Sequence, residues 1–175
     1  EKLFKDNNVQ VFSTNFPLYG DLSNRVMKIL SEFTPEIEVY SIDEIFLKFK
    51  GFEKYDLQEY GYRMKDKVAD YTRIPVSIGY APTKALAKVA NRIAKKFPNE
   101  CKGVYIIDTE QKRIKALKCL KIEDVWGIGR RLGVKMRDAG VNKAWDLLQK
   151  PEIWVRKIMG IHGTRMINEL KGIQQ

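Results

Sequence analysis

Two adjacent acids, Asp43 and Glu44, interrupt an apolar, β-branched and aromatic run in the stretch VYSIDEIFLKF, residues 39–49. Burying an unpaired carboxylate costs roughly several kcal/mol. The run can therefore pack as strands only if the chain turns at the acids and brings them to solvent or to a cation. We expect two short strands within residues 36–50, with the break near Asp43.

A hairpin tip with two carboxylates suits a hard divalent cation. Mg²⁺ binds one or two carboxylates and keeps other positions for water and phosphate oxygens. Asp43 and Glu44 are therefore candidate metal ligands and catalytic residues, in a site that would promote phosphoryl transfer. A solvated turn would carry the same two residues, so the dipeptide alone leaves both alternatives open.

The basic residues are concentrated in one third of the chain. The net charge is +10, and residues 84–143 hold 16 Lys and Arg against 6 Asp and Glu, whereas the rest holds 16 of each. This concentration favours a phosphate-bearing partner. By charge alone, a solubilising surface is an equal alternative.

The sequence PTKALAKVANRIAKK, residues 82–96, predicts a helix with one basic face and one apolar face. The basic face consists of Lys84, Lys88, Arg92 and Lys95. Neighbouring like charges on a helix repel by roughly a few tenths of a kcal/mol per pair, and a bound triphosphate or nucleic-acid backbone would relieve that repulsion. An exposed, solvated helix face is the alternative.

The sequence IEDVWGIGRRLGVKMRDAGV, residues 122–141, predicts a helix-hairpin-helix. Gly127, Ile128 and Gly129 would form a tight turn between two helices and present backbone N–H groups to a DNA phosphate. The side chains that would add positive charge are those of Arg130, Arg131 and Lys135. A purely structural turn is the weaker alternative, and GIHG at residues 160–163 is either a degenerate second hairpin or a loop.

The remaining periodicity predicts an α/β (α+β) fold followed by an all-helical part. We expect helices at residues 17–33 and 57–71 and one opening at Pro82, and strands at residues 74–80 and 103–107, which together favour a split βαβ sheet. After residue 111 only helical patterns appear, including residues 114–120 and 145–158. The predicted domains are therefore residues 1–110 and 111–175.

The sequence contains neither a zinc pattern nor an apolar run long enough to span a bilayer. Cys101 and Cys119 are far apart and His162 is the only histidine, so we expect reduced thiols, with a disulfide as the minor alternative. The expected location is cytoplasmic. Because the sequence opens on Glu1 in a polar stretch, we also expect a piece of a larger protein.

Four motifs together resemble the Y-family translesion DNA polymerases of the UmuC type. They occur in the family's order, as VFSTNFPLYGDLSNRVM at residues 11–27, YSIDE at 40–44, SIGYAPTKALAKVANRIAKK at 77–96 and VWGIGRRLGVKM at 125–136. The resemblance implies a ferredoxin-like palm fragment, residues 1–110, followed by a small helical thumb with a helix-hairpin-helix, residues 111–175.

The resemblance also implies roles for individual residues. Asp43 and Glu44 would hold two Mg²⁺ ions, Lys95 would contact the phosphates of the incoming nucleotide with Arg92 nearby, and Gly127–Gly129 would hold the duplex backbone. The family's first catalytic aspartate, in a D-F-D-x-F-F-like strand, has no counterpart in this sequence. The fingers, little finger and any clamp-binding peptide are also expected outside it, so the fragment alone should polymerise poorly or not at all.

The implied function is damage-induced (SOS) mutagenic repair synthesis by Mg²⁺-dependent nucleotidyl transfer to a primer 3′-hydroxyl. The implied partners are template-primer DNA, a deoxynucleoside triphosphate, a UmuD-type accessory dimer, a recombinase filament and a sliding clamp, in a bacterial cytoplasm and at the nucleoid during action. A non-catalytic DNA-binding module and a structural subunit with a basic surface are the competing classes. Metal binding at Asp43 and salt-dependent DNA binding separate the three.

Overall fold

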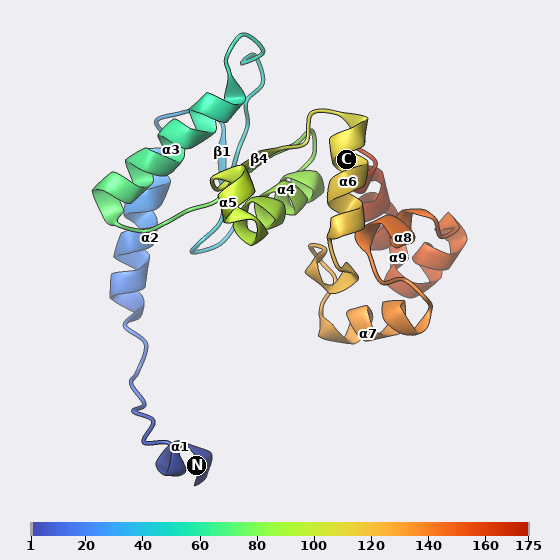
Figure 1. The fold of residues 1–175 in the computed structure, drawn as a ribbon, viewed down its shortest axis with the longest axis horizontal. Helices are drawn as coiled ribbons and strands as arrows, with labels where there is room; N and C mark the ends of the chain where they lie inside the picture. The colour runs from blue at the N-terminus through green and yellow to red at the C-terminus, as the bar shows by residue number, and fades with distance from the viewer. Residues whose placement is uncertain (1, 175) are drawn as a thin grey trace. The chain divides into compact units, whose positions relative to one another are not determined.

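The computed structural model describes residues 2–174 and divides the chain into two compact units, Glu1–Phe49 and Lys50–Gln175 (Figure 1). Within the described residues, no helix is both long enough and apolar enough to cross a membrane.

Unit 1 contains two helices and a β-hairpin. These are α1 (Lys2–Asp6), α2 (Phe16–Leu30), β1 (Ile37–Val39) and β2 (Ile45–Leu47). Helix α2 begins where the Asn15 side chain accepts a hydrogen bond from the Leu18 N–H at 3.1 Å, and Pro17 occupies its first turn. The predictions of a helix near residues 17–33 and of two strands that break near Asp43 are confirmed.

The β1–β2 hairpin is antiparallel, with Val39 opposite Ile45. Its open end is held by two contacts, a hydrogen bond from Thr34 Oγ1 to the Lys48 carbonyl at 2.7 Å and an ion pair between Lys48 and Glu36 at 2.6 Å. Nearer the tip, the rings of Tyr40 and Phe46 meet edge to face, 5.8 Å between centroids. These contacts fix the register and hence the residues at the tip.

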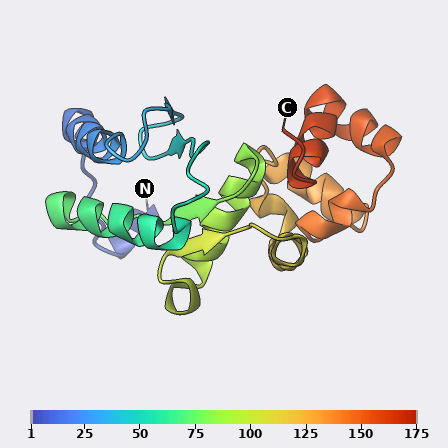
Figure 2. The same ribbon diagram turned by 90° about the horizontal axis from the view of Figure 1, so that it is seen from above.

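Unit 2 begins with a helix, continues with a β-α-β arrangement and ends in helices. Its elements are α3 (Leu57–Thr72), β3 (Ile78–Tyr80), α4 (Lys84–Lys96), α5 (Pro98–Cys101), β4 (Val104–Ile106), α6 (Glu110–Cys119), the 3₁₀ helix η1 (Ile122–Asp124), α7 (Arg130–Asp138), α8 (Ala144–Leu148) and α9 (Glu152–Leu170). Strands β3 and β4 are parallel neighbours, as Figure 2 shows, with α4 as part of the connection between them. The α/β fold with a helical C-terminal part is therefore confirmed.

Helix α4 lies unusually close to β3. A Cβ atom at Gly79 would collide with the backbone of Asn91 and Ala87, so only glycine permits this approach. The Asn91 side-chain amide also donates a hydrogen bond to the Ser77 carbonyl at 2.5 Å. Residue 79 thus fixes where α4, with its basic face, sits on the sheet.

Several details differ from the sequence predictions. The strands form two separate two-stranded sheets instead of one split sheet. Strand β3 begins only at Ile78, after Pro75, which has no N–H to donate to a ladder. The helix predicted at residues 145–158 is two helices, because Pro151 separates α8 from α9, and α9 continues to Leu170 through a kink at Gly160, whose φ is 65°.

A single hydrophobic core runs through unit 2 on both sides of residue 110. Leu86 of α4 belongs to the same buried cluster as Leu117 of α6, Met136 of α7 and Leu170 of α9. Because this core does not separate the residues before 110 from those after it, the domain division predicted at residues 110/111 remains a prediction. Cys101 and Cys119 are free thiols at the edge of this core, in agreement with the expectation of reduced cysteines.

The end of α9 is bound to the start of α4. The Glu169 carboxylate accepts a hydrogen bond from the Ala85 N–H at 2.8 Å, and the Glu169 carbonyl accepts one from Thr83 Oγ1 at 2.8 Å. Thr83 is also the N-cap residue of α4, since its hydroxyl accepts from the Leu86 N–H. The positive end of α4 is thus occupied by a carboxylate of the protein itself.

Candidate functional site

The two predicted catalytic carboxylates lie at the tip of the β1–β2 hairpin. The Glu44 carbonyl accepts hydrogen bonds from the N–H groups of Tyr40 and Ser41 at 3.0 and 3.1 Å, so Ser41, Ile42 and Asp43 form the connecting loop. Asp43 is exposed and Glu44 is half-buried. The turn that two adjacent acids were expected to require is present.

The Asp43 side chain is held in place within the loop. Ser41 Oγ donates a hydrogen bond to Asp43 Oδ1 at 2.7 Å, and the Asp43 N–H donates to the same hydroxyl at 3.4 Å. One carboxylate oxygen therefore has a partner inside the loop. The arrangement restricts the rotamers of Asp43, as expected of a residue that positions a ligand.

The chemical type of the side chains at this tip suits a Mg²⁺ ion. Both side chains offer hard carboxylate oxygens, and Mg²⁺ sites commonly use one or two carboxylates together with water and substrate phosphates. No group of three or more His, Cys, Asp or Glu side chains that could hold a metal ion occurs within residues 2–174. If this tip held such an ion, Asp43 and Glu44 would supply its two protein ligands and the others would come from water or substrate.

The basic face of α4 is only partly open to a ligand. Lys84, Arg92 and Lys95 are exposed and Lys88 is half-buried. Arg92 forms an ion pair with Asp124 at 2.7 Å, and the Lys88 ammonium lies 6.0 Å from the centroid of the Trp126 ring. No ion pair of Lys95 occurs among the described residues, so Lys95 is better placed than Arg92 to bind an added phosphate.

The Gly127–Gly129 turn has the exposure expected of a phosphate-binding turn. Gly127 and Gly129 are exposed while Ile128 is buried and anchors the turn, and Gly127 has a φ of 85°. Helix α7 starts directly after its N-cap residue Gly129, and no N-cap side chain accepts a hydrogen bond from the first N–H groups of the helix. The charged residues predicted to help, namely Arg130, Arg131 and Lys135, are all exposed.

The second glycine motif, residues 160–163, behaves differently from the first. It lies within α9, where Gly160 alone departs from helical geometry. Ile161 is 49% exposed whereas the corresponding Ile128 is 5% exposed, so no buried side chain anchors a turn there. Of the two alternatives left open by the sequence, a degenerate hairpin describes this kink better than a loop, because two helices meet across Gly160.

The sequence did not single out the residues that connect α4 with the turn. Asp124 and Trp126 lie in η1 and just after it, and they contact Arg92 and Lys88 respectively. The structure thereby brings the basic face of α4 beside the segment that leads into the Gly127–Gly129 turn. One signal in the sequence could have indicated the Asp124 contact, because Asp124 is one of few acids in the basic third of the chain.

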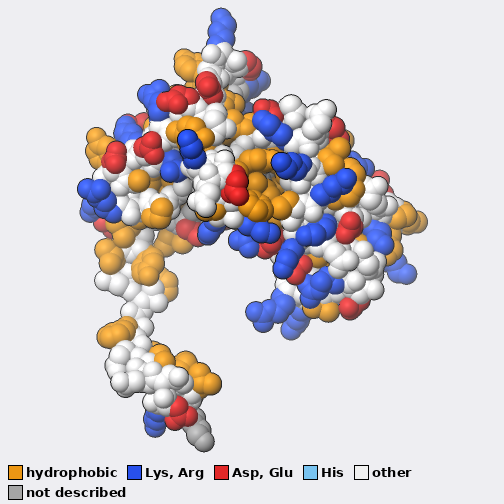
Figure 3. All heavy atoms as spheres, viewed as in Figure 1, with side chains coloured by type: hydrophobic (Ala, Val, Ile, Leu, Met, Phe, Trp, Pro, Cys, Tyr) orange, Lys and Arg blue, Asp and Glu red, His pale blue; other side chains and the backbone are white. Residues whose placement is uncertain are grey.

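Charge is distributed unevenly over the surface of unit 2. In Figure 3 lysine and arginine side chains gather over the part that contains α6, α7, α8 and α9.

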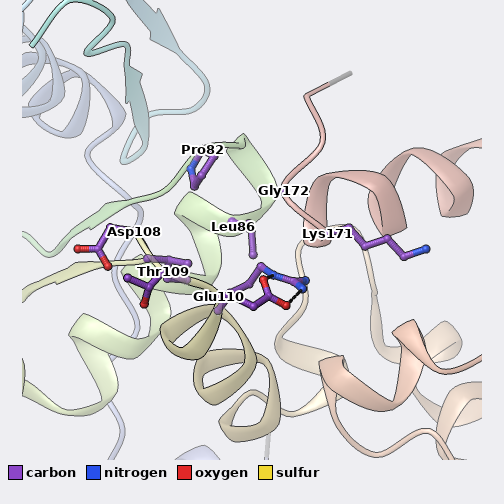
Figure 4. Close-up of a pocket in the computed structure, with 9 residues that line it drawn as sticks. Pro82, Leu86, Asp108, Thr109, Glu110, Lys171 and Gly172 are labelled. Atoms are coloured by element: carbon purple, nitrogen blue, oxygen red, sulfur yellow. Dashed lines mark hydrogen bonds and ion pairs between the residues drawn. The ribbon is translucent and has the colours of Figure 1, made fainter. Parts of the chain in front are cut away.

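The pocket in Figure 4 is lined by groups that bind one another. Glu110 accepts hydrogen bonds from Arg113 at 2.6 and 2.8 Å, and Arg113 also donates to the Leu170 carbonyl. This pocket contains none of the predicted site residues.

Comparison with known proteins gives consistent matches. A profile described as the impB/mucB/samB family matches residues 1–92. The chain is 38% identical to Protein UmuC of Salmonella typhimurium over 170 residues, 97% of this chain and 40% of that protein. It is 33% identical to DNA polymerase IV of Sulfurisphaera tokodaii over 136 residues, 75% of this chain and 36% of that protein.

Solved structures agree with these relatives. The fold matches the insertion ternary complex of Dbh DNA polymerase with a TM-score of 0.76 and 27% sequence identity, covering 97% of this chain and 49% of that one. The chain thus spans about 40% of the length of the curated relatives that it matches and about half of the matching solved chains. The resemblance to Y-family, UmuC-type polymerases is confirmed, and the chain belongs to the impB/mucB/samB family.

Proposed function

We propose that this chain is the palm-and-thumb part of a translesion DNA-directed DNA polymerase, which transfers nucleotides to a primer 3′-hydroxyl during SOS mutagenic repair synthesis. The observation that carries the proposal is the hairpin tip at which Ser41 holds Asp43 beside Glu44. Its relatives named Protein UmuC and DNA polymerase IV support the same reading.

In this proposal Asp43 and Glu44 hold Mg²⁺, with two ions expected in the complete enzyme. The bound metal would activate the primer hydroxyl and neutralise charge on the attacked phosphate. Ser41 orients the Asp43 carboxylate through its hydrogen bond. Lys95, with its exposed ammonium, binds the phosphates of the incoming deoxynucleoside triphosphate, and Arg92 contributes only when it leaves Asp124.

The Gly127–Gly129 turn and the start of α7 grip the template-primer backbone as a helix-hairpin-helix. The exposed backbone of the two glycines and the uncapped helix start support this role. The charged side chains that assist are Arg130, Arg131 and Lys135. A UmuD-type accessory dimer, a recombinase filament, a sliding clamp and action in the cytoplasm at the nucleoid are proposed from family resemblance alone.

The test is primer extension by the complete protein that contains this sequence. Asp43→Asn should abolish extension while DNA binding and the thermal unfolding midpoint stay unchanged. Asp70→Asn is the matched control, because Asp70 is exposed on α3 and far from the hairpin in sequence. Extension retained at the wild-type rate by Asp43→Asn would exclude the assignment.

A non-catalytic DNA-binding module is the second candidate. It is favoured by one observation, that the hairpin tip offers only two carboxylates within the described residues. Titration with Mg²⁺ or Mn²⁺, followed by NMR at the Asp43 and Glu44 amides in the presence of primer-template DNA, separates the two. The binding-module reading predicts no response at either amide.

A further inference from the structure

A second cluster of lysines lies where the end of α6 meets the segment before α8. Lys121 and Lys143 oppose each other in an isolated antiparallel bridge. The flanking hydrogen bonds, from the Ile122 N–H to the Asn142 carbonyl and from the Ala144 N–H to the Leu120 carbonyl, are each 3.0 Å long. This pattern defines a non-hydrogen-bonded pair, the type in which opposing side chains are closest, with Cβ atoms about 4.5–5.5 Å apart.

A third lysine lies next to this pair. Lys118 is exposed on α6 three residues before Lys121, and its ammonium lies 5.5 Å from the centroid of the Trp145 ring. Trp145 follows Lys143 by two residues. We call Lys118, Lys121 and Lys143 the α6 cluster.

The charge of the α6 cluster is not neutralised by an ion pair within the described part of the chain. The nearby carboxylates already have partners: Glu123 binds Arg137 at 3.0 Å, Asp124 binds Arg92 at 2.7 Å, and Asp146 accepts from the N–H groups of Asn142 and Lys143 at 3.0 and 2.9 Å. Like charges directly opposite each other destabilise a strand pair. Part of this repulsion is already relieved, because Lys121 helps to lower the pKa of Glu123 and the Asp146 carboxylate lies beside the Lys143 backbone. Three lysines still face these two carboxylates, one of which also binds Arg137, and an anionic ligand would offset the remaining positive charge.

The surroundings of the α6 cluster favour a nucleic acid over a protein. The centre of a protein interface needs exposed apolar or aromatic anchors. No large, exposed hydrophobic side chain occurs in residues 110–121 or 141–149. Lysines beside an aromatic ring instead match surfaces that follow a phosphodiester backbone.

We propose that Lys118, Lys121 and Lys143 form a second binding surface for the DNA backbone, separate from the Gly127–Gly129 turn. The proposal rests on the proposed function in that its ligand is DNA. Because lysine ammonium groups act as point charges toward phosphates, this surface binds without reading sequence. It lengthens the DNA contact beyond the turn and makes binding more sensitive to salt.

The experiment measures DNA affinity against salt concentration by fluorescence anisotropy. The chain, the variant Lys118→Gln/Lys121→Gln/Lys143→Gln and a control, Lys5→Gln/Lys28→Gln/Lys54→Gln, are each titrated with a mixed-sequence duplex. The control loses the same net charge from exposed lysines outside the basic third. Each phosphate contact contributes about 0.9 to the slope of log affinity against log salt, so loss of the α6 cluster should reduce the slope by about 2.7. The control should match the wild type.

Two outcomes would overturn the inference. Equal slopes for the cluster variant and the control would do so, whether or not both are reduced from the wild-type slope. Poly-glutamate that binds the wild type as tightly as DNA, with the same dependence on the cluster, would assign the surface to an acidic protein. The variant Arg130→Gln/Arg131→Gln tests DNA binding at the Gly127–Gly129 turn. A reduced salt slope for this variant supports the proposed function even if the α6 cluster variant shows no effect.

In the complete protein, a lack of DNA affinity at low salt would sink the proposed function along with the inference. Thermal unfolding controls for misfolding, and the midpoint of the cluster variant should be equal to or above the wild-type midpoint because repulsion is removed. If the triple variant unfolds, the single variant Lys121→Gln replaces it. Its expected reduction in slope is about 0.9, and an unchanged slope would overturn the inference.

Discussion

The Arg92 guanidinium lies 2.7 Å from the Asp124 carboxylate, and this ion pair joins α4 to the segment that precedes the Gly127–Gly129 turn. The Asp124 side chain is 22% exposed and that of Arg92 is 49% exposed, so water partly screens the pair. A phosphate can recruit Arg92 only by competing with Asp124. We therefore expect Lys95 to bind a phosphate more readily than Arg92.

The Arg92–Asp124 ion pair predicts a small effect on stability. Asp124→Asn should lower stability by up to about 1 kcal/mol, since partly exposed pairs contribute about 0–1 kcal/mol. For a domain of this size that corresponds to a fall of about 2–4 °C in the unfolding midpoint.

In the complete protein, Lys95→Gln should weaken nucleotide binding more than Arg92→Gln does, as measured by titration calorimetry. The reverse order would show that Arg92 leaves Asp124 to bind the triphosphate.

The close approach of α4 to β3 makes a second prediction. Gly79→Ala places a methyl group against the backbone of Asn91 and Ala87, which cannot move aside as a flexible side chain could. Overpacking of this kind typically costs about 1–3 kcal/mol, and a collision with backbone falls at the upper end. The matched control is Gly20→Ala, because a Cβ at Gly20 meets nothing within 4 Å and alanine favours the helix interior. Urea unfolding should show a loss for the first variant and no loss for the second.

The local elements were predictable because their signals are local. Alternation in residues 37–47 and the acids at its centre predicted the hairpin, and apolar residues at helical spacing predicted α2. The break at Pro151 was missed, whereas an interruption at Gly160 was expected, as a degenerate hairpin or a loop.

The contacts between distant segments could not be predicted from the pattern. The Arg92–Asp124 pair joins residues 32 positions apart, and the Glu169–Ala85 bond joins residues 84 positions apart. Periodicity places a residue on a face but does not say which face meets which. The candidate residues were therefore identified individually, while their mutual relationships required the fold.

The open position of Gly129 predicts a change in DNA binding without a change in fold. A Cβ at Gly129 meets nothing within 4 Å, and its φ of −79° suits any residue. The added methyl group would stand at the exposed start of α7, where a phosphate is proposed to approach. Gly129→Ala should weaken DNA binding about tenfold, close to the loss of one hydrogen bond to a charged group. Anisotropy titration measures this, and unchanged affinity would argue against phosphate binding at the turn.

The Glu169 carboxylate at the start of α4 gives a prediction on stability. Glu169→Ala removes the acceptor of the Ala85 N–H and the negative charge at a helix N-terminus. Loss of such a cap typically costs about 0.5–2 kcal/mol. Asp66→Ala, which removes an exposed carboxylate from the middle of α3, is the control. Thermal unfolding should show a lower midpoint for Glu169→Ala, and equal midpoints would mean that water replaces the carboxylate without cost.

Acid should weaken the fold through two exposed glutamates of unit 2. A hydrogen bond with Arg113 holds the pKa of Glu110 below its usual value. The pKa of Glu123 is lowered by a hydrogen bond from its own backbone N–H and by Arg137. A folded-state pKa below the unfolded one means that the unfolded chain binds more protons, so stability rises with pH across this range.

The contribution of both groups is therefore fully present above the ordinary glutamate pKa of about 4.3 and is lost as the pH falls through the lowered folded-state values. Unfolding midpoints measured between pH 6 and pH 3 should fall, and the variant Glu110→Gln/Glu123→Gln should fall less steeply because it has no such protons to take up. The double variant should also start from a lower midpoint at pH 6, since it lacks both charge-assisted contacts. Parallel curves for the two proteins would assign the acid sensitivity to other carboxylates.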